Sequence, residues 1–370
     1  SRCAIARVRP GVGKEPIYSF ASGQSSLPAE IRESVRADVE ARRQGGLSVL
    51  ELPFTCNEAR AILHETEAGL RDLLGVPKDY EVLFLQGGAY AQFGILAMNL
   101  GGGSRVGAYV EAGHWSRRAV HEAGPWVRVH RAALGDGLRL PLPDKWEVPP
   151  QAAYCHYTSN ESAEGLQFPS EPHGIGAPLM ADMTADLLTR PLDVGKFGLL
   201  YASSQKNIGI AGVTVVIVAK SLVERCAKDI PAPFHYGQQA RERSKVNTPP
   251  LFAIAVAGHV CRWLIADGGL DAAGARNAEK SRLLYSHIQR DGFYSSPIDP
   301  AFRSKVSVRF HLPTPQLEAK FLAQARDHGF LHLEGHSGVG GLRASLYNFV
   351  TLQAVEALSQ FMKEFERANG

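Results

Sequence analysis

Two charged residues stand at the ends of short apolar runs in the middle of the chain. The apolar run 199–202 gives way to small polar residues that lead to Lys206, and a second apolar run follows at 213–218. This pattern predicts Lys206 on a short loop between two buried strands. Asp182, 24 residues earlier, ends the apolar stretch 178–181. Open α/β sheets place their ligands at strand ends of this kind, so we expect both side chains near one site.

An amine and a carboxylate at neighbouring strand ends have two interpretations. They form an ordinary ion pair, or they belong to a pyridoxal phosphate site. In such a site a lysine forms the Schiff base with the cofactor and an aspartate keeps the pyridine nitrogen protonated. The spacing alone leaves both interpretations open.

The composition argues against several classes of protein. The 370 residues are 45% hydrophobic and 21% charged, which allows a large core and favours one large and one smaller domain. The formal charge is only +3, with no long lysine or arginine run, so nucleic acid is not expected as a partner. The longest apolar stretches, such as 252–260, are too short to span a membrane, so we expect a soluble protein.

The cysteines and the N-terminal segment indicate the compartment. The five cysteines include no Cys-x-x-Cys motif and no Cys/His cluster, which argues against a disulfide framework and against a zinc site. We therefore expect reduced thiols in a cytoplasmic enzyme without a metal. The first 14 residues are basic but lack the apolar stretch of a secretory signal. Residues 1–20 are predicted to form an N-terminal arm, and the remnant of a processed leader is the alternative.

Apolar periodicity and the positions of glycine and proline predict alternating helices and strands. The expected helices are 29–44, 58–74, 93–100, 249–266, 271–291, 315–328 and 352–368, with one more opening at His114. The expected strands are 47–52, 80–85, 105–110, 125–130, 152–157, 178–182, 199–202, 213–218, 306–312, 331–333 and 342–347. The order within 80–218 indicates an α/β domain with a mostly parallel sheet flanked by helices.

Three further predictions concern organisation. Strand 80–85, the pair Gly87-Gly88 and the helix after them could aim backbone N–H groups at a phosphate. The segment 231–250 is long and irregular, so we expect it to reach a partner subunit. The large domain is predicted to span 21–267, and a small α+β C-terminal domain to span 268–370.

Four motifs resemble one family. They are Ala181-Asp182-Met-Thr with Arg190-Pro191, Gln205-Lys206-Asn-Ile-Gly-x-Ala-Gly-Val-Thr, Asn247-Thr248-Pro249-Pro250, and Gly340-Gly341-Leu-Arg343-Ala-Ser. Together they resemble the phosphoserine aminotransferase family of class V pyridoxal phosphate enzymes, over nearly the whole chain. The resemblance implies a fold-type I homodimer, with active sites at the subunit boundary and cofactor ligands from both chains.

The resemblance also implies which residues bind pyridoxal 5'-phosphate. Lys206 would form the Schiff base and later move the substrate Cα proton, and Asp182 would hold the ring nitrogen. Trp115 alone is typical of a core, but it matches the aromatic residue that stacks on the ring. The other implied ligands are the Ser162 hydroxyl near the phenolic oxygen and, around the phosphate, the backbone amides of Ala89 and Tyr90, the side chain of Gln205, and Asn247 with Thr248 from the second subunit.

Departures from the family concern the substrate. Where members usually read Ser-His-Arg-Gly, this chain has Pro53-Phe54-Thr55-Cys56, and the family's Gly-His-Arg becomes Gly335-His336-Ser337. Two arginines of the pocket for the distal anion are therefore missing, whereas His336 and Arg343, which matches the α-carboxylate ligand, remain. Two lost charged hydrogen bonds represent roughly 3–6 kcal/mol. An aromatic side chain such as that of Phe54 would favour a less charged substrate.

Several functions stay open at this stage. The favoured hypothesis is transfer of an amino group between an α-amino acid and a 2-oxo acid with altered side-chain specificity. The first alternative is the phosphoserine:2-oxoglutarate aminotransferase of serine biosynthesis, with other basic residues such as Arg42, Arg241 or Arg243 restoring the pocket's charge. The second alternative is a pyridoxal phosphate-dependent lyase, decarboxylase or condensing enzyme. A binding protein without activity is disfavoured because Lys206 and Asp182 are both present.

Overall fold

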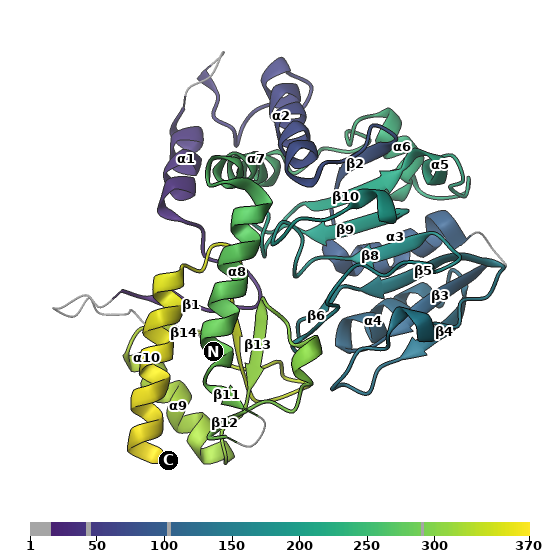
Figure 1. Cartoon of the computed structure of the whole chain (residues 1–370). Coiled ribbons are helices and arrows are strands. Elements are labelled where there is room, and N and C mark those ends of the chain that lie inside the picture. The colour runs from purple at the N-terminus through teal and green to yellow at the C-terminus, as the bar shows by residue number, and fades with distance from the viewer. Residues whose placement is uncertain (1–15, 42–45, 102–104, 290–291) are drawn as a thin grey trace, which may run out of the picture.

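A seven-stranded sheet forms the centre of the larger part of the molecule (Figure 1). The computed structural model describes residues 16–41, 46–101, 105–289 and 292–370. The strand order is β2 (Tyr80–Leu85), β10 (Thr214–Ala219), β9 (Leu199–Ser203), β8 (Leu179–Asp182), β5 (Ala152–Thr158), β3 (Val106–Glu111), β4 (Arg128–Leu134). Strand β10 runs antiparallel to β2 and β9, and the other neighbouring pairs are parallel. The prediction of a mostly parallel sheet is confirmed.

Helices cover both faces of this sheet. Residues such as Leu200 and Ala202 pack on the face of α2 (Asn57–Leu74) and α7 (Leu251–Ala266). The alternate residues Leu199 and Tyr201 pack on the face of α3 (Gly88–Gly101) and α4 (His114–Ala123). Because both faces are buried, these strands are nearly continuous apolar runs in the sequence. Helix α1 (Ala29–Glu40) lies beside α7.

The C-terminal part builds a second core. Helices α8 (Gly269–Tyr285), α9 (Pro315–Asp327) and α10 (Leu352–Asn369) surround the antiparallel pair β13 (Ser307–Phe310) and β15 (Leu342–Ser345). Strand β1 (Tyr18–Ser19) pairs with β14 (Phe330–Leu331), and Phe20 is buried in this core. The last residues of the predicted arm are therefore part of this fold, and residues 1–15 lie outside the described part. The domain boundary at 267/268 stays a prediction.

Several predicted elements are wrong or shifted. The predicted strand 47–52 consists of turns, because the Ser48 hydroxyl and the Glu51 carboxylate accept local backbone N–H groups in place of a strand partner. The predicted helix 271–291 begins at Gly269 and ends at Tyr285, and β11 (Ile288–Gln289) follows, paired with β12 (Tyr294–Ser295). The irregular segment 231–250 contains the short helix α6 (Tyr236–Arg241). Helix α3 begins at Gly88, five residues before the predicted start. Residues 42–45, including Arg42, lie outside the described part.

Three further features of the described residues concern membrane-spanning helices, thiols and metal ligands. No single helix there is long and apolar enough to cross a membrane, although α7 and α8 together meet the length and composition and are bent by 84° at their junction. Cys56, Cys155, Cys226 and Cys261 are free thiols. No group of three or more His, Cys, Asp or Glu side chains in the described ranges could hold a metal ion.

Candidate active site

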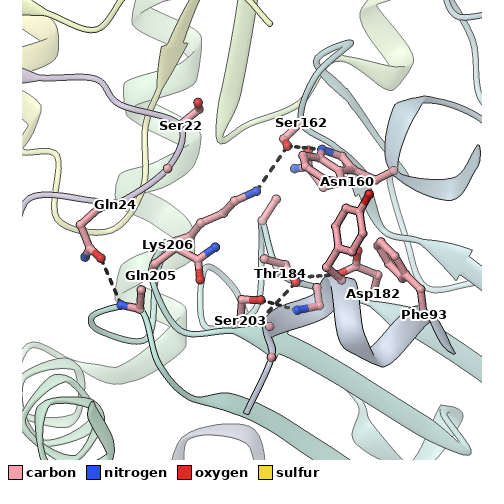
Figure 2. Close-up of a pocket in the computed structure, with 18 of the residues that line it drawn as sticks. Ser22, Gln24, Phe93, Asn160, Ser162, Asp182, Thr184, Ser203, Gln205 and Lys206 are labelled. Atoms are coloured by element: carbon pink, nitrogen blue, oxygen red, sulfur yellow. Dashed lines mark hydrogen bonds between the residues drawn. The ribbon is translucent and has the colours of Figure 1, made fainter. Parts of the chain in front are cut away.

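The carboxyl edge of the parallel strands opens into one cavity. Asp182 ends β8 and Ser203 ends β9, while β2 leads into Gly87 and Gly88 at the start of α3. The cavity has a volume of about 680 Å³ (Figure 2). It is lined by nine of the predicted site residues: Ala89, Tyr90, Trp115, Ser162, Asp182, Gln205, Lys206, His336 and Arg343.

Ser162 connects three of these residues. Its hydroxyl oxygen lies 3.3 Å from Lys206 Nζ and accepts a 3.0 Å hydrogen bond from Trp115 Nε1. Its carbonyl oxygen accepts a 2.9 Å hydrogen bond from Arg343 Nη1. Figure 2 shows the Lys206 side chain extended toward Ser162 across the cavity. The amine also lies 5.8 Å from the centre of the Trp115 ring. The amine, the indole and the guanidinium are therefore held around one point of the cavity wall.

Asp182 is the acid of the site and is almost completely buried, with 5% of its surface exposed. Its Oδ1 accepts the backbone N–H of Thr184 at 3.0 Å. Burial raises the pKa of Asp182, and the hydrogen bonds from Thr184 and the charge of Lys206 oppose this rise. A buried carboxylate whose ionised form is disfavoured by burial is suited to a cationic partner in the cavity.

The start of α3 has the geometry of an anion site. Gly87 and Gly88 have φ values of 93° and 70°, which favour glycine, and the Ala89 amide donates to Ser203 Oγ at 2.6 Å. A Cβ at Gly88 would lie 3.2 Å from that hydroxyl. No acidic residue occurs in the first turn of this helix. Backbone N–H groups at such a terminus bind phosphate well.

Basic side chains lie on the small-domain side of the cavity. Arg343 on β15 and His336, on the turn before it, line the wall, and the His336 ring packs 4.4 Å from the His114 ring. Burial lowers the pKa of His336, and the positive charges of His114 and Arg343 lower it further. Burial also lowers the pKa of Arg343. The substrate side of the cavity thus offers one guanidinium and one imidazole from this chain.

Five predicted residues lie outside this cavity. Asn247 lines a separate small cavity beside Gln86, and the Thr248 carbonyl accepts a 2.8 Å hydrogen bond from the Gln86 side chain. Thr55 and Ser337 are exposed, and Phe54 is half-buried. A single chain does not bring these five residues to Lys206, so their part in an active site stays a prediction.

Other residues line the cavity without having been predicted as ligands. They are Gln24, Phe93, Asn160, Thr184 and Ser203, among others. Thr184 and Ser203 could have been found from the strand ends. Thr184 follows β8, which ends at Asp182, and Ser203 ends β9, the strand just before Lys206. Gln24 gives no such signal, since it reaches the site from 182 residues before Lys206, where its side chain bonds Gly209 and Ala211.

The cavity fits pyridoxal phosphate by the chemistry of its donors. It combines a buried lysine amine, a buried carboxylate, an indole beside the amine, and a glycine-rich helix start for the phosphate. These are the groups that such a cofactor needs for covalent attachment, ring protonation, stacking and phosphate binding.

Comparisons with known proteins agree with this donor set. Residues 17–358 match the family model described as aminotransferase class V. The phosphoserine aminotransferase of Nitrosomonas europaea is 42% identical over 362 residues, covering 95% of this chain and 98% of that protein. The phosphoserine aminotransferase of Azotobacter vinelandii is 43% identical over 356 residues, covering 95% of this chain and 99% of that protein.

Solved structures give the same picture. Phosphoserine aminotransferase from Bacillus circulans subsp. alkalophilus has a TM-score of 0.93 and 39% identity, covering 96% of this chain and all of that one. The pyridoxal phosphate-bound enzyme from Trichomonas vaginalis has a TM-score of 0.89 and 34% identity, covering 94% of this chain and 100% of that one. The chain therefore belongs to the class V aminotransferase family, with the fold-type I architecture, and is a pyridoxal phosphate-dependent aminotransferase.

Proposed function

We propose that this aminotransferase exchanges the amino group of phosphoserine with 2-oxoglutarate, giving 3-phosphohydroxypyruvate and glutamate. The main support is the sequence identity of 42% to phosphoserine aminotransferases along nearly the whole chain. The hypothesis of altered side-chain specificity finds no support in these similarities. It is the competing outcome of the experiment below.

The residues of the cavity have separate roles in this reaction. The bound cofactor supplies an electron-accepting ring that stabilises negative charge at the substrate Cα. Asp182 keeps a proton on the ring nitrogen, and the face of Trp115 limits the ring's movement. The Lys206 amine takes the proton from the substrate Cα and would deliver it to the cofactor, as the transfer of an amino group requires. The Arg343 guanidinium binds the substrate α-carboxylate, which fixes the Cα–H bond near that amine.

The remaining ligands are proposed to come from a second copy of the chain. Asn247 and Thr248 are exposed and lie away from the cavity of their own chain. The same exposed segment contains Arg241 and Arg243, so any site that receives Asn247 also receives nearby positive charge. Arg243 has a φ of 48°, a conformation that a non-glycine residue adopts at a cost of about 1 kcal/mol or more. We infer a homodimer with shared sites, in which these arginines replace the missing ones, and a cytoplasmic location.

A half-reaction assay tests the function. The holoenzyme is mixed with L-glutamate, and conversion of the cofactor to its amine form is followed by absorbance, with Lys206→Ala as the inactive control. The amine form is then titrated with 3-phosphohydroxypyruvate and with uncharged 2-oxo acids. We expect the phosphorylated acid to react with the higher kcat/KM, and Arg243→Gln to raise its KM.

Two results would contradict this proposal. A higher kcat/KM for an uncharged 2-oxo acid would establish the altered specificity instead. If no amino donor converts the cofactor to its amine form, the result would indicate lyase, decarboxylase or condensation chemistry on this scaffold.

A further inference from the structure

Helix α4 has no side-chain acceptor at its N-cap position, although the Ser116 hydroxyl accepts the amides of Ala112 and Gly113. Its N-cap residue is Gly113, which has no side chain to accept the first free N–H groups. The amide of Arg117 bonds the Gly113 carbonyl at 3.1 Å, which leaves the amides of His114, Trp115 and Ser116 to be satisfied elsewhere. This matters for the active site because Trp115 is the second residue of the helix.

Two glutamates from a distant part of the chain provide the missing acceptors: Glu161 ends β6 (Asn160–Glu161) and Glu164 lies in the turn after it. Glu161 accepts the amide of Trp115 with one carboxylate oxygen and the amide of Ser116 with the other, both at 2.8 Å. Glu164 accepts the amide of His114, also at 2.8 Å. Glu161 is completely buried and Glu164 is 5% exposed. All three free amides of the first turn therefore bond two buried carboxyl groups.

Gly113 makes this arrangement possible. A Cβ at Gly113 would lie 2.6 Å from the carboxyl carbon of Glu161, so a side-chain cap on the helix itself and Glu161 cannot occupy the same space. The helix thus depends on a carboxyl group supplied 45 to 48 residues later in the chain. Burial and the charge of Glu164 raise the pKa of Glu161, whereas the amides of Trp115 and Ser116 and the helix dipole favour its carboxylate form.

Ser162, which directly follows Glu161, contacts both Trp115 and Lys206. Ser162 accepts the Trp115 indole N–H at 3.0 Å and lies 3.3 Å from Lys206 Nζ. Trp115 is consequently held at two points by adjacent residues, its backbone amide by Glu161 and its ring nitrogen by Ser162. Two fixed points leave the indole little freedom to tilt.

We propose that Glu161, assisted by Glu164, is a positioning residue that sets the plane of the Trp115 indole for stacking on the cofactor. Neither glutamate lines the cavity, so each acts through the first turn of α4 and not by contact with the substrate. The inference is independent of which amino acid is the substrate, since it concerns the cofactor only.

Cofactor binding by the apoenzyme tests this inference. In Glu161→Gln one carboxylate oxygen becomes an amide donor, which cannot accept an N–H group. We expect pyridoxal phosphate to bind about tenfold more weakly, equivalent to about 1.4 kcal/mol, which is near the upper end of what a stacked aromatic pair contributes. The circular dichroism of the bound cofactor should weaken, and amide exchange at 114–116 should accelerate.

A matched control separates this effect from ordinary helix capping. Thr314 caps α9 through its hydroxyl, which accepts the Leu317 amide at 3.2 Å, and it does not line the cavity. Thr314→Ala should lower stability by a comparable loss of a cap. It should leave the cofactor affinity and the cofactor's circular dichroism unchanged.

A double-mutant cycle with Trp115→Ala decides the outcome. If Glu161 acts through the indole, Glu161→Gln should cause little further loss of cofactor affinity once the indole is absent. An equal loss in both backgrounds, or no loss in either, overturns the proposal. Should Glu161→Gln fail to fold, the same cycle is run with Glu164→Met, which removes the acceptor of the His114 amide and of the Arg117 side chain and is judged by the same criteria.

Discussion

Lys280 offers a sharp test of how buried polar groups support this fold. It lies on α8 with 2% of its surface exposed. Its ammonium donates to the carbonyls of Leu346, Tyr347 and Val350 at 3.1, 2.9 and 2.9 Å. These carbonyls belong to the turn after β15, which follows Arg343 by only a few residues. Lys280→Met keeps most of the side-chain volume and removes all three donors.

The expected cost follows from the three carbonyls. Each hydrogen bond to a charged group contributes about 1.5–3 kcal/mol, but keeping an ammonium buried costs several kcal/mol in lost hydration. The difference suggests that Lys280→Met lowers the free energy of unfolding by about 3 kcal/mol, because three buried carbonyls lose their partner. Burial lowers the pKa of Lys280 to about 7, whereas the three acceptors favour the charged form.

Urea denaturation of the holoenzyme measures this cost. Protein and cofactor concentrations are held constant, because association and ligand binding both shift apparent stability. The pH is set well below 7, so that the amine carries all three protons. Lys363→Met on α10 is the control, since Lys363 is exposed on a neighbouring helix. If Lys280→Met lowers the free energy of unfolding by no more than Lys363→Met does, the unsatisfied carbonyls do not have the expected cost.

Three further predictions concern the thiols, the pH response and the helix start of the phosphate site. Burial raises the pKa of Cys155 and of Cys261 to about 12, so peptide mapping should find both unmodified by a thiol reagent until the protein unfolds. The pKa of His336 is lowered in the fold, so the unfolded chain binds that proton more readily and the free enzyme should lose stability as the pH falls below about 6.5. In His336→Asn, melting curves should lack that component. Gly88→Ala forces an alanine to φ 70° and should weaken cofactor binding in a fluorescence titration, whereas unchanged affinity would contradict an anion site there.

The strands around the site could be predicted because their signal is local. Strand β2 has the predicted bounds. As expected, Asp182 ends β8 and Lys206 lies on the loop after β9. Apolar runs bounded by glycine or small polar residues contain that information within a few residues. The segment 47–52 has a similar apolar content, but its backbone N–H groups bond Ser48 and Glu51 within the same turn. Such local competition is invisible to a pattern of hydrophobicity.

The supports of the site could not be predicted, because their partners are distant in sequence. Glu161 lies in a polar stretch of the sequence, yet it is fully buried. Its partner Trp115 is 46 residues away, and nothing near either residue signals the contact. The site residues themselves were found through strand ends and family motifs, which single out the residues expected to contact the cofactor or substrate. Residues that act through another side chain are found only in three dimensions.

Three buried asparagines show why these supports matter for the lysine. The backbone N–H of Asn348 donates to Asn207 Oδ1 at 3.0 Å, and its side-chain NH2 donates to the Leu188 carbonyl at 2.8 Å. Its side-chain oxygen Oδ1 accepts a 2.8 Å hydrogen bond from the side chain of Asn277. Asn207 follows Lys206 directly and donates to the Ala185 carbonyl at 2.9 Å, on the segment after Asp182. One set of amides thus connects the loop of the amine, the segment of the acid and the turn held by Lys280. Because a buried amide without its partner costs about 1–3 kcal/mol, movement of any one of these segments disturbs the other two. The spacing of amine and acid is therefore fixed by contacts with the C-terminal core as well as by the central sheet.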